Sequence, residues 1–245
     1  MRNALLQTFT EMVKVLDIHS GWIAWNLCLA FIPFALSIWL YRRSRRRSLV
    51  WWGAFAVFMA FLPNAPYLLT DIIHLIRATR AGFSTWVITL FVIPLHLTAI
   101  IGGFQAYVLA VMNQSRYLAQ RGWRKWVLPS ELGTHLLCAV GVYLGRFDRF
   151  NSWDLVVDPN TVLLDTANNL TSRWPLLMIA ITFVVLTVTY WLVKQVTIGL
   201  NLRWQQWRAG FDWTEDVAWE RAHTVTAVVE RDRECGGATP SISLN

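Results

Sequence analysis

Polar side chains that could do chemistry are concentrated in two short runs of this sequence. The first run, residues 61–75, carries Asn64, Asp71 and His74 among mostly apolar neighbours. The second run, residues 145–154, carries a mixture of charged and amide groups, namely Arg146, Asp148, Arg149, Asn151 and Asp154. Carboxylates and imidazoles exchange protons with a substrate, and guanidinium groups bind phosphates or carboxylates through paired N–H donors. These residues are the candidate ligand-binding residues.

The pair Asp71 and His74 raises the question of a metal site. Their spacing puts both side chains on one face of a helix, where they can reach one proton or one metal ion. A pair with this spacing is common by chance, and His19 is the only further histidine expected on the same side of the membrane. We therefore predict no metal site, and no sequence pattern indicates a cofactor.

Five long apolar stretches must position these polar runs. A helix needs about 20 mostly apolar residues to cross the hydrocarbon core of a membrane. The stretches cover residues 22–41, 49–70, 84–112, 126–145 and 174–193. Charged residues make up 15% of the chain, against about 25% in a soluble domain. The predicted fold is all-α, a polytopic transmembrane bundle of about five spanning helices.

The sequence divides into three predicted parts. Residues 1–20 combine charged and apolar side chains at helical spacing, which predicts an amphipathic helix on the membrane surface. Residues 21–195 form the transmembrane helical domain. Residues 196–245 form a tail, and its glycine-containing end is typical of disorder.

Prolines interrupt the second apolar stretch. Pro63 and Pro66 lack backbone N–H donors, so we expect the helix of residues 49–62 to kink or stop near Pro63. Asn64 is expected to make a backbone or interhelical hydrogen bond beside this break. On the helix that follows, Asp71 and His74 share a polar face.

The distribution of Lys and Arg predicts the orientation of the chain. Positive residues collect on the cytoplasmic side of membrane proteins. With the arginine block of residues 42–47 inside, 15 Lys and Arg lie inside and 7 lie outside. We therefore predict an outside N-terminus and a cytoplasmic C-terminus. This bias accounts for the net charge of +7, so nucleic-acid binding is not expected. The tryptophans near the ends of the stretches, Trp22, Trp25, Trp39, Trp51, Trp52, Trp86, Trp123, Trp126, Trp174 and Trp191, are interpreted as interfacial anchors.

Four polar residues within the stretches have two interpretations. Asn26 is expected to bond a neighbouring helix. His96, Glu131 and His135 could form a proton relay. Alternatively, Glu131 lies beside Arg124 at the inner interface and His135 bonds a backbone carbonyl.

The two polar runs, together with Trp25-Asn26-Leu27 and Ile32-Pro33, resemble a bacterial family catalogued as domain of unknown function family 1361. The resemblance covers about residues 20–195. It implies a small multi-pass helical protein of the bacterial plasma membrane, and it carries no known activity, substrate or catalytic residue.

Several functions remain open at this point. The leading hypothesis is a polar ligand site at the outer face, for transport or binding, and its ligand could be anionic or lipid-linked. The alternatives are a membrane enzyme acting on a lipid-linked phosphate or sugar and a helper subunit of another membrane protein. In the enzyme, Arg146 and Arg149 would hold the anion, and Asp71 or His74 would act as acid or base. Structural pairing of the same charges is a further interpretation. Besides membrane lipids, the sequence identifies no partner, and it does not determine the oligomeric state.

Overall fold

The structure is a computed structural model that describes residues 2–44, 46–148, 157–158, 160, 164 and 173–208. The chain divides into two compact units, residues 1–194 and residues 195–245. Throughout the described residues the secondary structure is helical, without a strand. The predicted all-α class is therefore confirmed.

The first unit is built from long helices interrupted by short π-helical and 3-10 turns. In chain order the first elements are α1 (Arg2–Ile38), η1 (Trp39–Arg43), α2 (Leu49–Phe61), α3 (Asn64–Tyr67), η2 (Leu68–Asp71) and α4 (Ile72–Thr79). They are followed by α5 (Thr85–Val87), η3 (Ile88–Val92), α6 (Ile93–Gln120), η4 (Arg124–Trp126), α7 (Val127–Tyr143) and η5 (Leu144–Asp148). The last described helix, α10 (Arg173–Arg208), begins in the first unit and ends in the second.

Five helical stretches are long and apolar enough to cross a membrane, as the sequence predicts. They are Leu6–Arg43, Leu49–Thr79, Thr85–Gln120, Arg124–Phe147 and Arg173–Arg208. Their lengths are 38, 31, 36, 24 and 36 residues, so each exceeds the about 20 residues that a hydrocarbon core requires.

Residues 2–20 differ from the expectation of a separate surface helix. They are the first half of α1, which continues without interruption to Ile38. Val15 is fully buried against Ala78, Val87 and Val92, and Glu11 Oε2 accepts a hydrogen bond from the backbone N–H of Ser84 at 3.0 Å. Val15 thus anchors this segment to the protein, while Phe9, Val13 and Leu16 remain exposed. A position on the membrane surface stays a prediction.

The proline segment changes the hydrogen bonding of the second span. α2 ends at Phe61, and the chain continues through α3 into the 3-10 helix η2. Leu62 and Pro63 keep right-handed helical dihedrals, with φ of −56° and −60°. Pro66 cannot donate to the Leu62 carbonyl, and the Ala65 N–H bonds that carbonyl instead, at 3.2 Å. Asn64 Nδ2 donates to the carbonyl of Phe61 at 3.0 Å. A bend of the helix axis stays a prediction.

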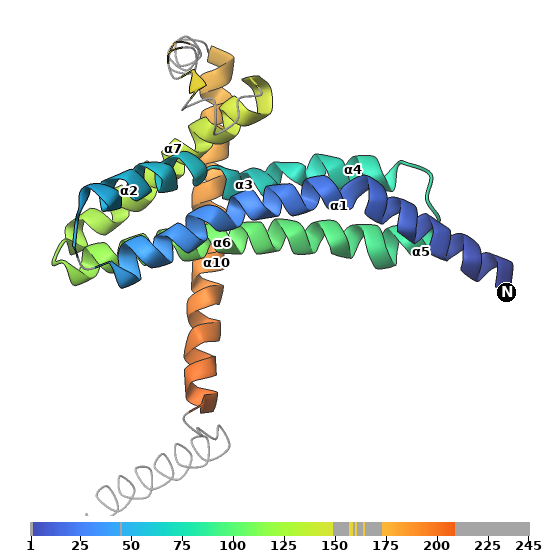
Figure 1. Cartoon of the computed structure of the whole chain (residues 1–245), viewed down its shortest axis with the longest axis horizontal. Helices are drawn as coiled ribbons and strands as arrows, with labels where there is room; N and C mark the ends of the chain where they lie inside the picture. The colour runs from blue at the N-terminus through green and yellow to red at the C-terminus, as the bar shows by residue number, and fades with distance from the viewer. Residues whose placement is uncertain are drawn as a thin grey trace, which may run out of the picture. The chain divides into compact units, whose positions relative to one another are not determined.

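α1, α6 and the run from α3 to α4 lie side by side (Figure 1). The parallel pair α1 and α6 forms the centre of the first unit, and α7 packs on α6 and α3. Two glycines allow close approach. A Cβ at Gly103 would lie 2.8 Å from the Leu68 side chain, and one at Gly141 would lie 2.6 Å from the ring of Pro63. The second and fourth spans therefore meet at Pro63 and Gly141.

Eight of the ten tryptophans interpreted as anchors have more than a third of their surface exposed, which fits that interpretation. Trp51 is different, because only 5% of its surface is exposed. Its Nε1–H donates to the Leu40 carbonyl at 3.1 Å, so Trp51 ties α2 to η1 inside the protein. Trp22 is half-buried among histidines, as described below.

The contact between Gly141 and Pro63 gives a stability prediction. Gly141→Ala should lower the free energy of unfolding by about 1–3 kcal/mol, because the proline ring cannot move aside for the added methyl group. Gly133→Ala is the matched control on the same helix, since nothing lies within 4 Å of its Cβ position. Thermal unfolding of both variants in one detergent measures the difference. Equal stability of the two variants would contradict the close packing.

Candidate functional site

The candidate site is organised by Asp71, the last residue of η2. Its side chain is buried, with 3% of the residue surface exposed. Asn26 on α1 donates from Nδ2 to Asp71 Oδ2 at 3.2 Å. Burying a carboxylate is costly unless hydrogen bonds or a cation compensate, so Asn26 supplies part of this compensation and joins the first span to the second.

Arg146 on η5 lies beside the same segment. Its Nη1 contacts the hydroxyl of Tyr67 and its Nη2 contacts the carbonyl of Thr70, both at 3.5 Å. The guanidinium carbon is 6.0 Å from the centre of the Tyr67 ring. Arg146 is also close enough for a coulombic interaction with Asp71 and with His74. The structure thus brings three predicted site residues, Asp71, His74 and Arg146, to one end of the first unit, which we call the Asp71 end.

Three histidines surround Trp22 at the Asp71 end. The ring centres of His74 and His96 lie 4.7 and 5.7 Å from that of Trp22, and His19 lies 5.1 Å from His96. Despite this proximity, the described residues contain no group of three side chains that could hold a metal ion.

His96 has one satisfied and one unsatisfied ring nitrogen. Its Nδ1 lies 2.8 Å from the Val92 carbonyl. A carbonyl only accepts hydrogen bonds, so Nδ1 carries the proton and Nε2 is an acceptor. This Nε2 is buried and has no hydrogen-bond partner among the described residues. His96, Asp71 and Trp22 line an enclosed cavity of about 10 Å³, which is about the space of one water molecule.

The remaining predicted residues are not all placed at this site. The Asn64 amide donates to Phe61 in its own helical segment. For Asp148 the structure describes only the backbone, and Arg149, Asn151 and Asp154 lie outside the described residues. Convergence of the complete set therefore stays a prediction.

The site also contains residues that the candidate set omits. Asn26 and His96 are noted in the sequence as polar groups in apolar stretches, but nothing there links them to Asp71. Tyr67 lies one helical turn before Asp71, so helical spacing alone predicts that it lies next to the site. The position of Trp22 between the histidines depends on the packing of α1 on α4 and α6.

A second polar cluster centres on Glu131 of α7. Its Oε1 accepts hydrogen bonds from Ser115 Oγ at 2.6 Å, Tyr190 OH at 2.8 Å and Lys194 Nζ at 2.6 Å. The cation that pairs with Glu131 is thus Lys194. The expectation that Glu131 lies beside Arg124 is wrong. His135 is hydrogen-bonded to the hydroxyl of Tyr107 and not to a carbonyl.

The Asp71 and Glu131 clusters are separate. On α6, His96 belongs to the first and Tyr107 to the second, and these positions are about 16 Å apart along a helix. The apolar side chains of Leu68 and Phe104 are buried at the level between them. His96, Glu131 and His135 therefore do not form the single relay that the sequence suggested.

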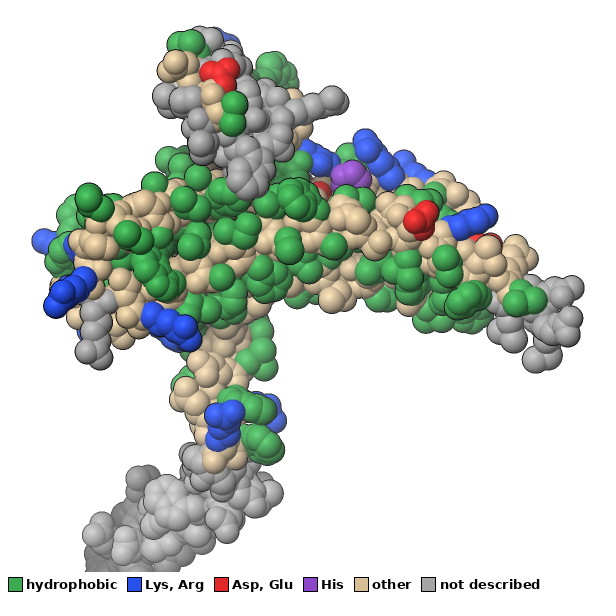
Figure 2. Space-filling model, viewed as in Figure 1, with side chains coloured by type: hydrophobic (Ala, Val, Ile, Leu, Met, Phe, Trp, Pro, Cys, Tyr) green, Lys and Arg blue, Asp and Glu red, His purple; other side chains and the backbone are tan. Residues whose placement is uncertain are grey.

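Figure 2 shows basic side chains at both ends of the first unit. We call the end opposite to Asp71, where residues 42–47 meet the end of α6, the arginine end. Arg42 Nε donates to Asn113 Oδ1 at 2.8 Å, and Arg47 Nε donates to the Tyr117 hydroxyl at 3.1 Å. The arginine block of residues 42–47 and the connection between α6 and α7 therefore lie at the same end.

Five apolar helices of spanning length, joined by polar contacts between them, define a polytopic α-helical membrane protein. The chain belongs to the family described as "Protein of unknown function (DUF1361)", whose model matches residues 25–188. The match includes Asn26, Asp71 and Arg146, and it ends before Lys194. No curated protein and no solved structure matches the chain.

The Glu131 cluster gives a second stability prediction. Lys194→Met leaves the Glu131 carboxylate without its cation and should lower stability by about 2–3 kcal/mol. This is less than the about 3–5 kcal/mol of a fully buried pair, because the Lys194 side chain is 24% exposed. Arg203→Met on the exposed surface of α10 is the control, expected to change little.

Adding Glu131→Gln to Lys194→Met removes the unpaired charge and should restore part of the loss. Chemical unfolding in detergent measures all three variants. A double variant as unstable as Lys194→Met would show that the charge is not the cause.

Proposed function

We propose that this chain is a multi-pass protein of the bacterial plasma membrane that binds a polar ligand with an anionic group at its Asp71 end. In this proposal the N-terminus and the Asp71 end face outside and the C-terminus is cytoplasmic. Binding at this face would serve reception or the first step of transport.

The observation that carries the ligand site is the state of Arg146. A guanidinium group has five N–H donors, and the hydrogen bonds of Arg146 to described residues are two long ones to neutral acceptors. No carboxylate among the described residues forms an ion pair with it. Its half-buried position leaves part of the group accessible. These features support capture of a phosphate or carboxylate, which binds guanidinium groups in a planar, bidentate geometry.

Asp71 supplies a fixed negative charge beside Arg146 at the same site. Asn26 holds the carboxylate in place, so the guanidinium has a defined neighbour and keeps donors that no described residue occupies. An anion bound to Arg146 and a hydroxyl or amine directed to Asp71 would together select a ligand with both groups. The buried Leu68 and Phe104 side chains below the site favour binding at one face, and passage across the membrane would require this layer to move.

The proposed orientation rests on the charge bias together with the packing. The two segments richest in arginine meet at one end of the first unit, and such an end is retained on the cytoplasmic side. The Asp71 end then faces outside.

Cysteine labelling tests the orientation. In a variant with Cys28, Cys138 and Cys235 replaced by alanine, single cysteines replace Arg80 or Lys125, which are both exposed. A membrane-impermeant maleimide added to intact spheroplasts should label the cysteine at position 80. Position 125 should react only after the membrane is opened. The reversed pattern would overturn the orientation.

Ligand-dependent stability tests the anion site. Purified protein in neutral nanodiscs is heated with inorganic phosphate, glycerol 3-phosphate or a sugar phosphate. A ligand at about 100 times its Kd stabilises the folded state by about 2.7 kcal/mol, and Arg146→Gln should abolish this shift. Arg80→Gln, an exposed control at the same end, should retain it.

Two results would count against the proposed site. The first is the absence of a shift with all three anions. The second is an Arg146→Gln variant that loses folded yield without ligand, which would show that Arg146 mainly closes the bundle.

A further inference from the structure

A groove at the arginine end has the chemistry of a lipid site. The two segments that meet there, residues 42–48 and 113–130, contain nine Lys and Arg and no Asp or Glu. The nearest acidic residue in sequence, Glu131, is already paired with Lys194. These two segments therefore carry a concentrated positive charge that no carboxylate within them balances.

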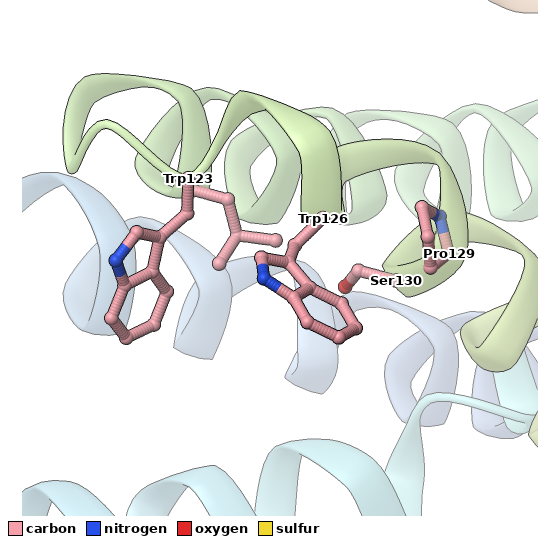
Figure 3. A pocket seen from close by; sticks show the side chains of 5 residues that line it. Trp123, Trp126, Pro129 and Ser130 are labelled. Carbon is pink, nitrogen blue, oxygen red and sulfur yellow. The ribbon is translucent and has the colours of Figure 1, made fainter.

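The groove lies between the end of α6 and the start of α7. It has a volume of about 530 Å³ and is lined by Leu118, Trp123, Trp126, Pro129 and Ser130. The two indole rings point to the same side of the backbone (Figure 3). They are 47% and 55% exposed, so the lining is mostly apolar and open to the surroundings.

One wall of the groove is held in place by stacked rings and a cation. The Arg47 guanidinium lies 5.4 Å from the Trp123 ring and 5.7 Å from each of the Trp51 and Tyr117 rings. Its Nε also donates to the Tyr117 hydroxyl. Trp123 is thus part of a preformed surface, and Arg47 is committed to protein contacts.

The remaining cations beside the groove are available to a ligand. Arg121, Arg124 and Lys125 are exposed and lie within a few residues of Trp123 and Trp126. Arg121 also lies 5.2 Å from the centre of the Tyr117 ring, a face contact that does not occupy its N–H donors. None of the three is in an ion pair with a described carboxylate. An apolar groove next to unpaired cations, in a chain with spanning helices, fits a molecule with one apolar chain and one negative headgroup.

We propose that this groove binds an anionic diacyl phospholipid. One acyl chain lies against Trp123 and Trp126, and the phosphate contacts Arg121, Arg124 and Lys125. A zwitterionic lipid would bring its own cation into this positive surface, so its binding is disfavoured. The site is distinct from the proposed ligand site at the Asp71 end, and it requires no assumption about which leaflet supplies the lipid.

Native mass spectrometry of the full chain tests the selectivity. Protein stripped of lipid in neutral detergent is titrated with phosphatidylglycerol or with phosphatidylcholine of the same chains. Each Lys or Arg near an anionic lipid contributes about fivefold in affinity, so the variant R121Q/R124Q/K125Q should bind phosphatidylglycerol about a hundredfold more weakly. The control K14Q/R77Q/R80Q removes three exposed cations elsewhere and should bind as the wild type does. Equal binding of the two lipids by the wild type, or equal loss in both variants, overturns the proposal.

Photo-crosslinking locates the lipid without any variant. Phosphatidylglycerol with a diazirine in one acyl chain is irradiated with wild-type protein, and the labelled peptides are sequenced. Crosslinks within residues 118–130 support the groove, and crosslinks confined to other segments overturn it. Excess glycerol 3-phosphate should leave these crosslinks unchanged, because it lacks the acyl chain. Competition by this soluble phosphate would show an anion site in place of a lipid site.

Discussion

A helix surrounded by lipid gains little from burying apolar side chains against another helix, because lipid tails are equally apolar. Association then depends on close packing at small residues and on hydrogen bonds between helices. Both appear in this chain at specific places. Gly103 and Gly141 let neighbouring spans approach, while polar pairs such as Asn26 with Asp71 connect helices far apart in sequence. The rest of the arrangement follows from these few contacts, since the apolar surfaces between them do not select one partner over another.

The same contacts divide the first unit into levels with different properties. At the arginine end, cations are held by aromatic rings and neutral side chains. The Glu131 cluster satisfies a buried carboxylate with three donors. The Asp71 end is less complete, because the nitrogen Nε2 of His96 has no described partner and Arg146 has only long contacts. Buried polar atoms without a described partner also occur on Tyr41 and Gln114. What distinguishes the Asp71 end as the functional candidate is therefore Arg146, a half-buried cation without an ion pair among the described residues.

The sequence predicts the elements of this fold better than the pairings between them. Apolar length identifies all five spans, and the two polar runs identify the family. Helical spacing also places Asp71 and His74 on neighbouring turns. However, the choice of Lys194 over Arg124 as the partner of Glu131 depends on how α10 meets α7, and hydropathy carries no information about that.

The depth of a polar residue does not follow from its place in an apolar stretch. The third span, which contains His96, is 36 residues long, so its middle need not coincide with the middle of the membrane. The sequence does not indicate that α1 continues through residue 20, because the charged residues there are typical of a surface segment, whereas Val15 packs inside the protein. The positions of Arg149, Asn151 and Asp154 relative to Asp71 stay predictions.

The length of the first span has a consequence for its surroundings. A helix of 38 residues is about 57 Å long, whereas the hydrocarbon core is about 30 Å thick. Even at a tilt of about 40°, the upper end of the usual range, it would rise about 44 Å. More than about 10 Å of this helix must therefore stand in the headgroup layer or in water. The first span is thus longer than the hydrocarbon core that it crosses. The thickness of the host bilayer will decide how much of α1 is exposed to water.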